Sequence, residues 1–221
     1  MRLLHPSYRF RLLLMVLVLV IIGMPVIAEL ADFDTTPVGL TIIVIGVITA
    51  SGRRTCPKIL VPAFSVLALV WVCTIYPDGG LVGFHYLGVS ALLLLSTSLS
   101  IIYLRQCREI DSEALSAAAA VYLLFGLACG GIYAAISIWV PGGLEFTGLD
   151  KDPGIHEHTY FSFVVLTTIG FGDVVPRDAL NRSMAMLEGI AGLFYLAIVI
   201  SRLVSLYHQG SGSRDTTNSI K

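Results

Sequence analysis

The sequence predicts an all-α membrane protein with six transmembrane helices. Hydrophobic residues make up 56% of the 221 residues and charged residues only 13%, whereas soluble domains carry roughly a quarter charged residues. The mean hydropathy is +0.84. A chain this apolar requires lipid as its solvent, which excludes soluble enzymes and soluble binding modules.

A membrane-spanning helix needs about 20 mainly apolar residues. The second of the six predicted spans, Thr36–Gly52, reaches that length only if the polar residues at its two ends are counted. Arginines before the first run also resemble a secretory signal, and cleavage after Ala28 would leave five spans. The five clearest spans are Leu12–Ala28, Ile59–Ile75, Gly83–Leu104, Ala114–Val140 and Ser183–Tyr207.

The distribution of charge predicts the orientation of these spans. Basic residues collect in the N-terminus and in the loops after the second and fourth spans, whereas the other loops are mainly acidic. By the positive-inside rule, both termini lie in the cytoplasm. We therefore expect an integral protein of the plasma membrane, with an acidic outer face that attracts cations.

Three regions follow from this layout. Residues 1–110 form a four-helix membrane region, residues 111–208 a second membrane unit, and residues 209–221 a polar tail that we expect to be disordered. The fifth span contains Gly126-x-x-x-Gly130, a spacing that lets helices approach closely in lipid. It should end at Pro141-Gly142-Gly143. The four cysteines form no metal-binding or redox spacing.

The most informative motif is Thr167-Thr168-Ile169-Gly170-Phe171-Gly172-Asp173, which follows a half-length helix (159–167) between the last two spans. A cation that crosses a membrane must exchange its water shell for other oxygens. To turn successive backbone carbonyls toward one axis, residues must alternate between opposite-handed conformations, which glycine adopts at little cost. Gly170 and Gly172 meet this requirement. Ile169 and Phe171 should point away and brace the strand, while Thr168 adds a hydroxyl and Asp173 a carboxylate.

The segment Thr168–Asp173 resembles the selectivity filter of potassium channels. Phe171 replaces the more common tyrosine, which removes a hydroxyl behind the filter but keeps the carbonyls. The resemblance covers Ser112–His208, under half of the chain, as outer helix, re-entrant pore helix and inner helix. It implies a homotetramer in lipid that conducts potassium passively, without cofactor or nucleic acid. Potassium would bind at Thr168, Ile169, Gly170 and Phe171.

The same resemblance suggests where the channel opens. Gly192 lies where the family carries a hinge glycine, and Gly189 lies one turn earlier; close helix packing explains both equally well. Leu196 and Ile200 follow on a stripe that would line an apolar cavity or gate. The fourth span lacks the regular arginines of a voltage sensor, so we expect little dependence on voltage.

Glu188 is an ionisable residue within a span, where a charge costs at least about 2.5–3.5 kcal/mol. We predict that it is buried and hydrogen-bonded and that it supports the filter, with Thr167 and Tyr160 as candidate partners. The alternative is a carboxylate in an aqueous cavity that attracts cations. His156 and His158 are interpreted as solvated loop residues or as proton sensors, and Asn181 as the cap of the last helix.

Four other functions remain open on sequence grounds. These are a poorly selective cation channel, a transporter subunit with a filter-like loop, a membrane enzyme, and a non-conducting subunit that modifies other channels. The complete Thr-Ile-Gly-Phe-Gly-Asp string argues against the first. A single copy of the motif argues against the second, because such transporters carry four. The few polar residues in the spans argue against an enzyme.

Overall fold

The computed structural model describes residues 9–31, 41–43, 46, 79–106, 112–148 and 152–218. In these parts the chain is mostly helical, with one short pair of strands. The elements in chain order are α1 (Arg9–Ala31), α4 (Gly79–Gln106), α5 (Ser112–Trp139), β1 (Leu144–Phe146), α6 (Ile155–Leu166), β2 (Val174–Pro176) and α7 (Ala179–Asn218).

Four of the described helices are long and apolar enough to cross a membrane, and they correspond to the first, fourth, fifth and sixth predicted spans. Together with the channel-like segment described below, they indicate an integral membrane protein. The other two predicted spans lie almost wholly outside the described residues. The four segments are Arg9–Ile27, Val82–Arg105, Ser112–Trp139 and Ala179–Arg202.

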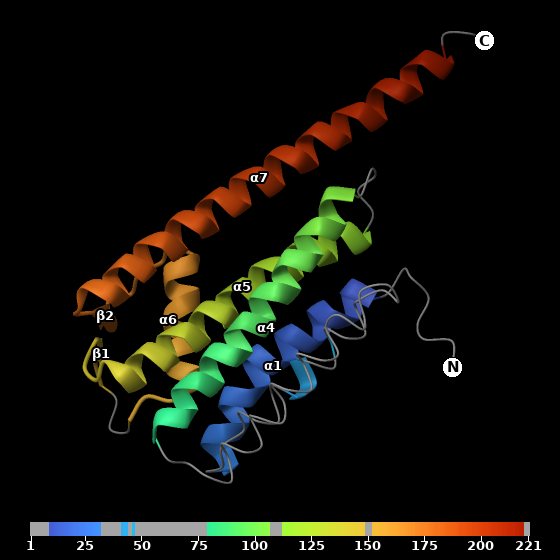
Figure 1. Cartoon of the computed structure of the whole chain (residues 1–221). Coiled ribbons are helices and arrows are strands. Elements are labelled where there is room, and N and C mark those ends of the chain that lie inside the picture. The colour runs from blue at the N-terminus through green and yellow to red at the C-terminus, as the bar shows by residue number, and fades with distance from the viewer. Residues whose placement is uncertain are drawn as a thin grey trace.

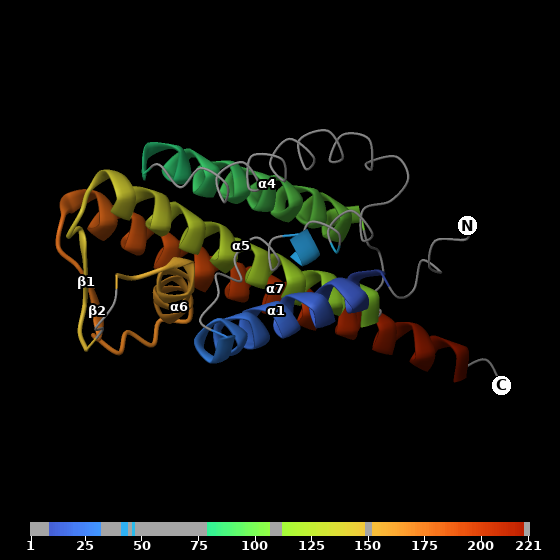
Figure 2. The ribbon, with the colours of Figure 1, turned by 90° about the horizontal axis from the view of Figure 1, so that it is seen from below.

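The helix α5 lies at the centre of the arrangement, because it packs against α1, α4, α6 and α7. The helices α1, α4, α5 and α7 are long, whereas α6 is short and steeply inclined to α5 and α7 (Figures 1 and 2). One apolar cluster joins α1, α4 and α5 around Leu17, Leu93 and Leu124. A second joins α5 to α6 around Tyr133 and Phe161. The short helix is therefore attached to the rest of the chain mainly through α5.

Glycines of α5 allow this close attachment. A Cβ at Gly126 would come within 2.6 Å of the Phe163 ring, and one at Gly130 within 2.7 Å of the Thr159 backbone. Both contacts are to α6, so the spacing Gly126-x-x-x-Gly130 is the face on which the short helix packs. The close approach predicted from these small residues is confirmed.

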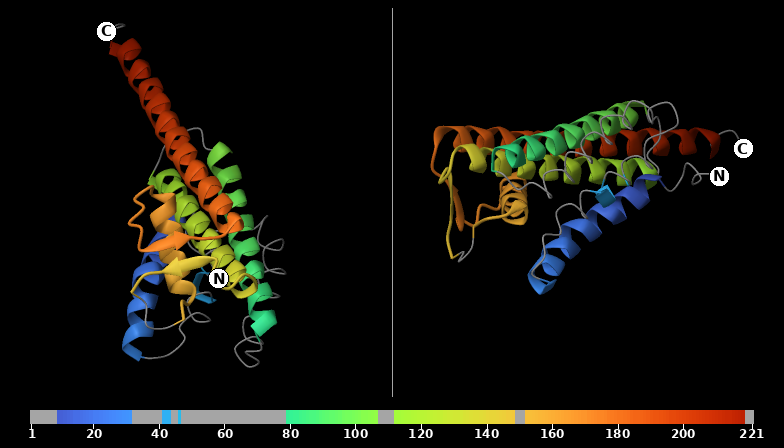
Figure 3. Two further views of the ribbon diagram at one scale, coloured as in Figure 1. Left: turned by 90° about the vertical axis from the view of Figure 1, so that its left-hand side faces the viewer. Right: turned by 60° about the horizontal axis from the view of Figure 1, so that its bottom comes forward.

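A two-stranded antiparallel ribbon adds a small β-element to a fold predicted as all-α. The ribbon lies at one end of the molecule (Figure 3), and its register pairs Leu144 with Pro176 and Phe146 with Val174. The sequence did not reveal it, because three residues per strand are too few to show an alternating pattern. The ribbon joins the segment after α5 to the segment between α6 and α7.

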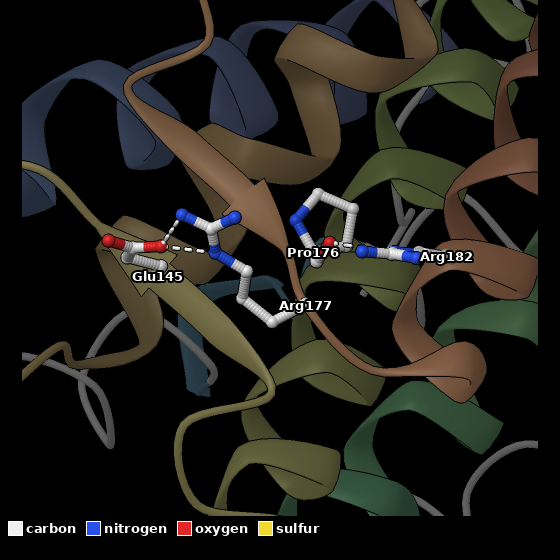
Figure 4. A network of polar contacts seen from close by, with 4 residues as sticks. All are labelled: Glu145, Pro176, Arg177 and Arg182. Carbon is white, nitrogen blue, oxygen red and sulfur yellow. Dashed lines mark hydrogen bonds and ion pairs between the residues drawn. The ribbon is translucent and has the colours of Figure 1, made fainter.

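The ribbon carries a local polar network at its surface (Figure 4). Arg177 forms an ion pair with Glu145 on the neighbouring strand. Arg182, on the first turn of α7, donates a hydrogen bond of 3.2 Å to the carbonyl of Pro176. The first contact holds the segment after β2 to β1, and the second connects α7 to β2, so the ribbon is attached to the last helix.

The ends of α5 and α7 test three expectations. The helix α5 ends at Trp139, just before Pro141-Gly142-Gly143, as predicted. The helix α7 begins with Asp178 as its cap: Oδ1 accepts hydrogen bonds from the backbone of Leu180 (2.8 Å) and Asn181 (3.0 Å). Asn181 is instead fully buried, so its assignment as the cap was wrong by one turn.

The third expectation was a disordered tail from residue 209. The helix α7 instead continues to Asn218, past the ends of the other helices (Figure 1). Composition suggested disorder, since this stretch is polar and rich in Gly and Ser. However, extending an existing helix requires no new nucleation, which is the costly step in helix formation.

Candidate functional site

The short helix α6 begins earlier than the predicted residue 159. Its first residue is Ile155, with Gly154 at the N-cap. The Glu157 carboxylate accepts a hydrogen bond of 2.8 Å from the Gly154 backbone and so satisfies an amide that the helix leaves unpaired. Because His-Glu-His looks polar, sequence reasoning placed His156 and His158 in a loop. Both lie in the first turns of α6.

At its other end, α6 continues into a segment that folds back on the helix. The carbonyl of Val164 accepts hydrogen bonds from the backbone of Ile169 (3.1 Å) and Gly170 (3.4 Å), and that of Val165 accepts one from Thr168 (2.9 Å). The last carbonyls of a helix have no partner within the helix. Here the segment 168–170 supplies those partners, so its backbone position is set by α6.

The backbone of this segment alternates in handedness. Thr168, Gly170 and Gly172 have φ angles of 58°, 61° and 80°. Among the described residues, Thr168 is the one non-glycine residue with positive φ, a conformation that costs a residue with a Cβ about 1–2 kcal/mol. The sequence indicated the two glycines but not Thr168. Strain of this kind is typical of functional sites.

The C-terminal end of the segment is fixed by its aspartate. Tyr160 of α6 donates a hydrogen bond of 2.6 Å to Oδ2 of Asp173, and Oδ1 accepts one of 3.0 Å from the Val174 backbone. The carbonyl of Asp173 accepts a further bond of 2.8 Å from the backbone of Thr147. The segment is thus held at both ends, by α6 and by the ribbon.

Between these ends the side chains have few contacts within the chain. Ile169 is 57% exposed and Phe171 is 67% exposed. Within a single chain, therefore, these two side chains lack the packing contacts that the predicted bracing role requires. A Cβ at Gly170 or at Gly172 would meet nothing within 4 Å. Both faces of the segment are open in a single chain.

Glu188 lies where α5, α6 and α7 meet. It is 2% exposed. Its Oε2 accepts a hydrogen bond of 2.8 Å from Tyr133 of α5, and its Oε1 lies 2.5 Å from Oγ of Ser162 of α6. The predicted burial and hydrogen bonding are confirmed, and the carboxyl does not face open solvent as the cavity alternative requires.

The two partners predicted for Glu188 were wrong. Tyr160 bonds to Asp173, and the Thr167 hydroxyl donates to the Phe163 carbonyl at 2.6 Å. Sequence spacing along α7 showed that Glu188 faces α6 but not which side of α6 it meets. Ser162 was missed for that reason, and Tyr133 was missed because it belongs to a third helix, α5. Thr167 and Tyr160 still contact the segment, one at each end.

The two glycines of α7 differ in their surroundings. A Cβ at Gly192 would approach the carbonyl oxygen of Leu166 to 2.7 Å, whereas one at Gly189 would approach Val165 no closer than 3.8 Å. The same Leu166 carbonyl accepts a hydrogen bond of 2.9 Å from Tyr122 of α5. Gly192 is thus required for packing of α7 on the end of α6, one of the two roles considered for it.

The other predicted residues of α7 lie on its open face. Leu196 and Ile200 are both exposed in a single chain. On the opposite face, Tyr195 donates a hydrogen bond of 2.6 Å to the Ala118 carbonyl of α5. The stripe predicted to line a cavity is therefore left uncovered by the chain's own helices.

His158 is buried at 2% exposure and bridges α6 to α5. Nδ1 lies 2.6 Å from the carbonyl of Gly154, and Nε2 lies 2.8 Å from Oγ of Ser137. Burial lowers the pKa of His158, although the Gly154 carbonyl and the charge of Glu157 act in the opposite direction. The interpretation of His158 as a solvated loop residue was wrong.

Comparison with known proteins agrees with this geometry. Residues 146–209 match the family model described as "Ion channel". The match runs from β1 through α6, the alternating segment and β2 into α7. No curated protein and no solved structure matches the chain. The family match indicates a channel rather than an enzyme, and residues 146–209, less than half of the chain, are similar to ion channels of the potassium-channel type.

Proposed function

We propose that the chain is a potassium-selective channel subunit that conducts passively through cages of backbone carbonyls. The observation that supports this proposal is the alternation of positive φ at Thr168, Gly170 and Gly172. Such alternation turns consecutive carbonyls toward the same side, where they replace the water shell of a cation. Potassium would bind at Thr168, Ile169, Gly170 and Phe171, and the ions are the permeant ligand rather than a cofactor.

Four copies around one axis would complete these cages. The exposure of Ile169 and Phe171 supports assembly, because a strand open on both faces cannot enclose an ion. One face of α7 is also apolar and exposed, which is typical of a surface that packs against other copies or lipid. Its exposed residues include Met186, Leu187, Ile190, Leu193 and Phe194. The partners are then further copies of the chain and membrane lipid, without nucleic acid.

The same proposal includes the topology of the subunit, its gate and the residues that support the filter. The subunit has six transmembrane helices in the plasma membrane with both termini in the cytoplasm. The end of the filter at Asp173 faces outward, where acidic loops attract cations. Residues of α7, namely Gly189, Gly192, Leu196 and Ile200, serve as hinge or gate. Glu188, Thr167 and Tyr160 support the filter, as their positions behind it and at its two ends suggest.

Flux from liposomes that hold only the purified chain tests this function. We expect potassium current, with reversal potentials in mixed potassium and sodium that follow the potassium gradient. Equal permeation of sodium would contradict selectivity and favour a general cation channel. Absence of current from a correctly folded protein in the same liposomes would favour a subunit that only modifies other channels.

Substitution of a filter glycine tests whether the current passes through the filter. Gly170→Ala places a Cβ at a φ of 61°, which costs about 1–2 kcal/mol in each subunit. We expect loss of conduction or of potassium preference. Gly148→Ala is the matched control, because Gly148 has a φ of 80° and equally open surroundings but lies in an outer turn. A fully selective Gly170→Ala channel would overturn the carbonyl-cage proposal.

A further inference from the structure

The hydrogen-bond distances around Glu188 show how many protons its contacts require. The hydroxyl of Ser162 lies 2.7 Å from the carbonyl oxygen of Gly126 and 2.5 Å from Oε1 of Glu188. Both distances are typical of O–H···O hydrogen bonds. Each such contact needs one proton between its two oxygens. The Ser162 hydroxyl carries one, and a carbonyl oxygen carries none.

An ionised Glu188 leaves one of these two contacts without a proton. If Ser162 donated to the carboxylate, its oxygen would face the Gly126 carbonyl oxygen at 2.7 Å with no hydrogen between them. If Ser162 donated to Gly126, the same conflict would arise with the carboxylate at 2.5 Å. Two acceptors at such distances repel each other, and the site is too buried for water to separate them.

A protonated Glu188 satisfies every contact. Its Oε1–H donates to Ser162, and Ser162 donates to the carbonyl of Gly126. Tyr133 donates to Oε2 at 2.8 Å. The thiol of Cys129 also contacts this carboxyl. The resulting chain of hydrogen bonds runs from α7 through α6 to α5 in one direction, so that each member strengthens the next.

We propose that Glu188 is a neutral carboxylic acid whose proton links α7 to α6 and so positions the filter. The link acts through α6, because Ser162 lies half a turn before Val164, whose carbonyl holds the backbone of Ile169 and Gly170. Glu188 is thus a positioning residue that does not touch the ion. This role rests on the proposed channel function, whereas the protonation state does not.

Infrared difference spectra of the full chain in liposomes test directly whether the Glu188 carboxyl carries a proton. Wild type minus Glu188→Gln should show the C=O stretch of a protonated carboxyl, shifted in heavy water. Ser162→Ala should shift this band, because it removes the acceptor of the Glu188 proton. Glu145→Gln, which removes a surface carboxylate paired with Arg177, should leave the band unchanged. Absence of the band from the wild-type spectrum, with a carboxylate signal in its place, would overturn the proposal.

Currents from the same liposomes test the positioning role. Glu188→Gln keeps a neutral group that accepts from Tyr133 and donates to Ser162, so conductance and potassium preference should match wild type. Glu188→Ala should shorten openings and weaken selectivity. Equal loss in both variants would refute the role of the proton. If wild type itself fails to select potassium, the channel proposal fails, while the infrared band still decides the protonation of Glu188.

Discussion

The hydroxyl of Tyr160 donates a hydrogen bond of 2.6 Å to Oδ2 of Asp173, which joins the middle of α6 to the end of the proposed filter. The hydrogen bond to Asp173 raises the pKa of the Tyr160 phenol. Because Asp173 is also held by the backbone of Val174, the tyrosine adds a second restraint on the same carboxylate. The Asp173 end of the proposed filter is therefore fixed by a bond between two side chains.

Tyr160→Phe should therefore loosen the Asp173 end of the proposed filter while keeping the aromatic ring. We expect shorter openings and a faster loss of current under sustained conduction, measured in single-channel records. Tyr103→Phe, which alters a tyrosine of α4 that stacks on Phe10 of α1, is the control. Open times unchanged in Tyr160→Phe would show that the Val174 contact is sufficient.

The two glycines of α7 should respond differently to alanine. Gly192→Ala drives a Cβ to 2.7 Å from the Leu166 carbonyl, an overpacking that typically costs about 1–3 kcal/mol. Gly189→Ala introduces only an ordinary contact with Val165 at 3.8 Å. We expect lower thermal stability and altered gating for Gly192→Ala and near-normal behaviour for Gly189→Ala. Thermal unfolding in detergent and liposome currents measure the two effects, and equal effects would contradict the packing role.

Sequence reasoning succeeded where a local pattern has a unique physical meaning. Apolar length located α5, and the spacing of Gly170 and Gly172 predicted the alternating backbone of the segment after α6. It failed where distant segments meet. The three-residue strands around Glu145 become visible only through their pairing. The strained φ of Thr168 depends on its bond to Val165, and no property of threonine predicts it.

For Glu188, sequence reasoning predicted the burial of the side chain but not its hydrogen-bond partners. A carboxyl in a span must be paired or neutral, and this physical rule correctly predicted its burial. The identity of its partner on α6, Ser162, depends on the rotation of α6 about its own axis. That rotation is set by close packing of Phe163 on Gly126, a contact between elements that no local pattern contains.

The cap of α7 should be sensitive to acid. Hydrogen bonds from Asn181, first from its backbone and then from its side chain, lower the pKa of Asp178. The carboxylate therefore stabilises the fold above the pKa it has in the unfolded chain, and this stabilisation is lost as pH falls through the lower folded value. Asp178→Asn, which keeps an acceptor, should be milder than Asp178→Ala. Thermal unfolding as a function of pH measures both, and equal losses would argue against capping.

His158 should make the channel sensitive to acid at the side of the filter that carries Asp173. Burial lowers its pKa, so the folded chain favours the neutral ring. The unfolded chain binds a proton near the ordinary pKa of about 6.5, so stability falls as pH drops from that value toward the lower folded one. The groups around the ring are the Gly154 carbonyl, Ser137 of α5, Glu157 and the ring of Phe146. A charge forced into this site would also oppose the positive end of the α6 dipole.

We therefore expect current to fall on acidification and the fall to be reduced in His158→Gln, which keeps a donor for Gly154. His156→Gln, two residues earlier on the same helix, should retain the wild-type acid response. Liposome currents with pH varied on one side at a time measure this response. An acid response that survives in His158→Gln, or in a channel with both histidines replaced, would assign the effect to another group. A response lost in His156→Gln alone would move the sensor to that residue, and the buried bridge from α6 to Ser137 would then serve only to hold the pore helix.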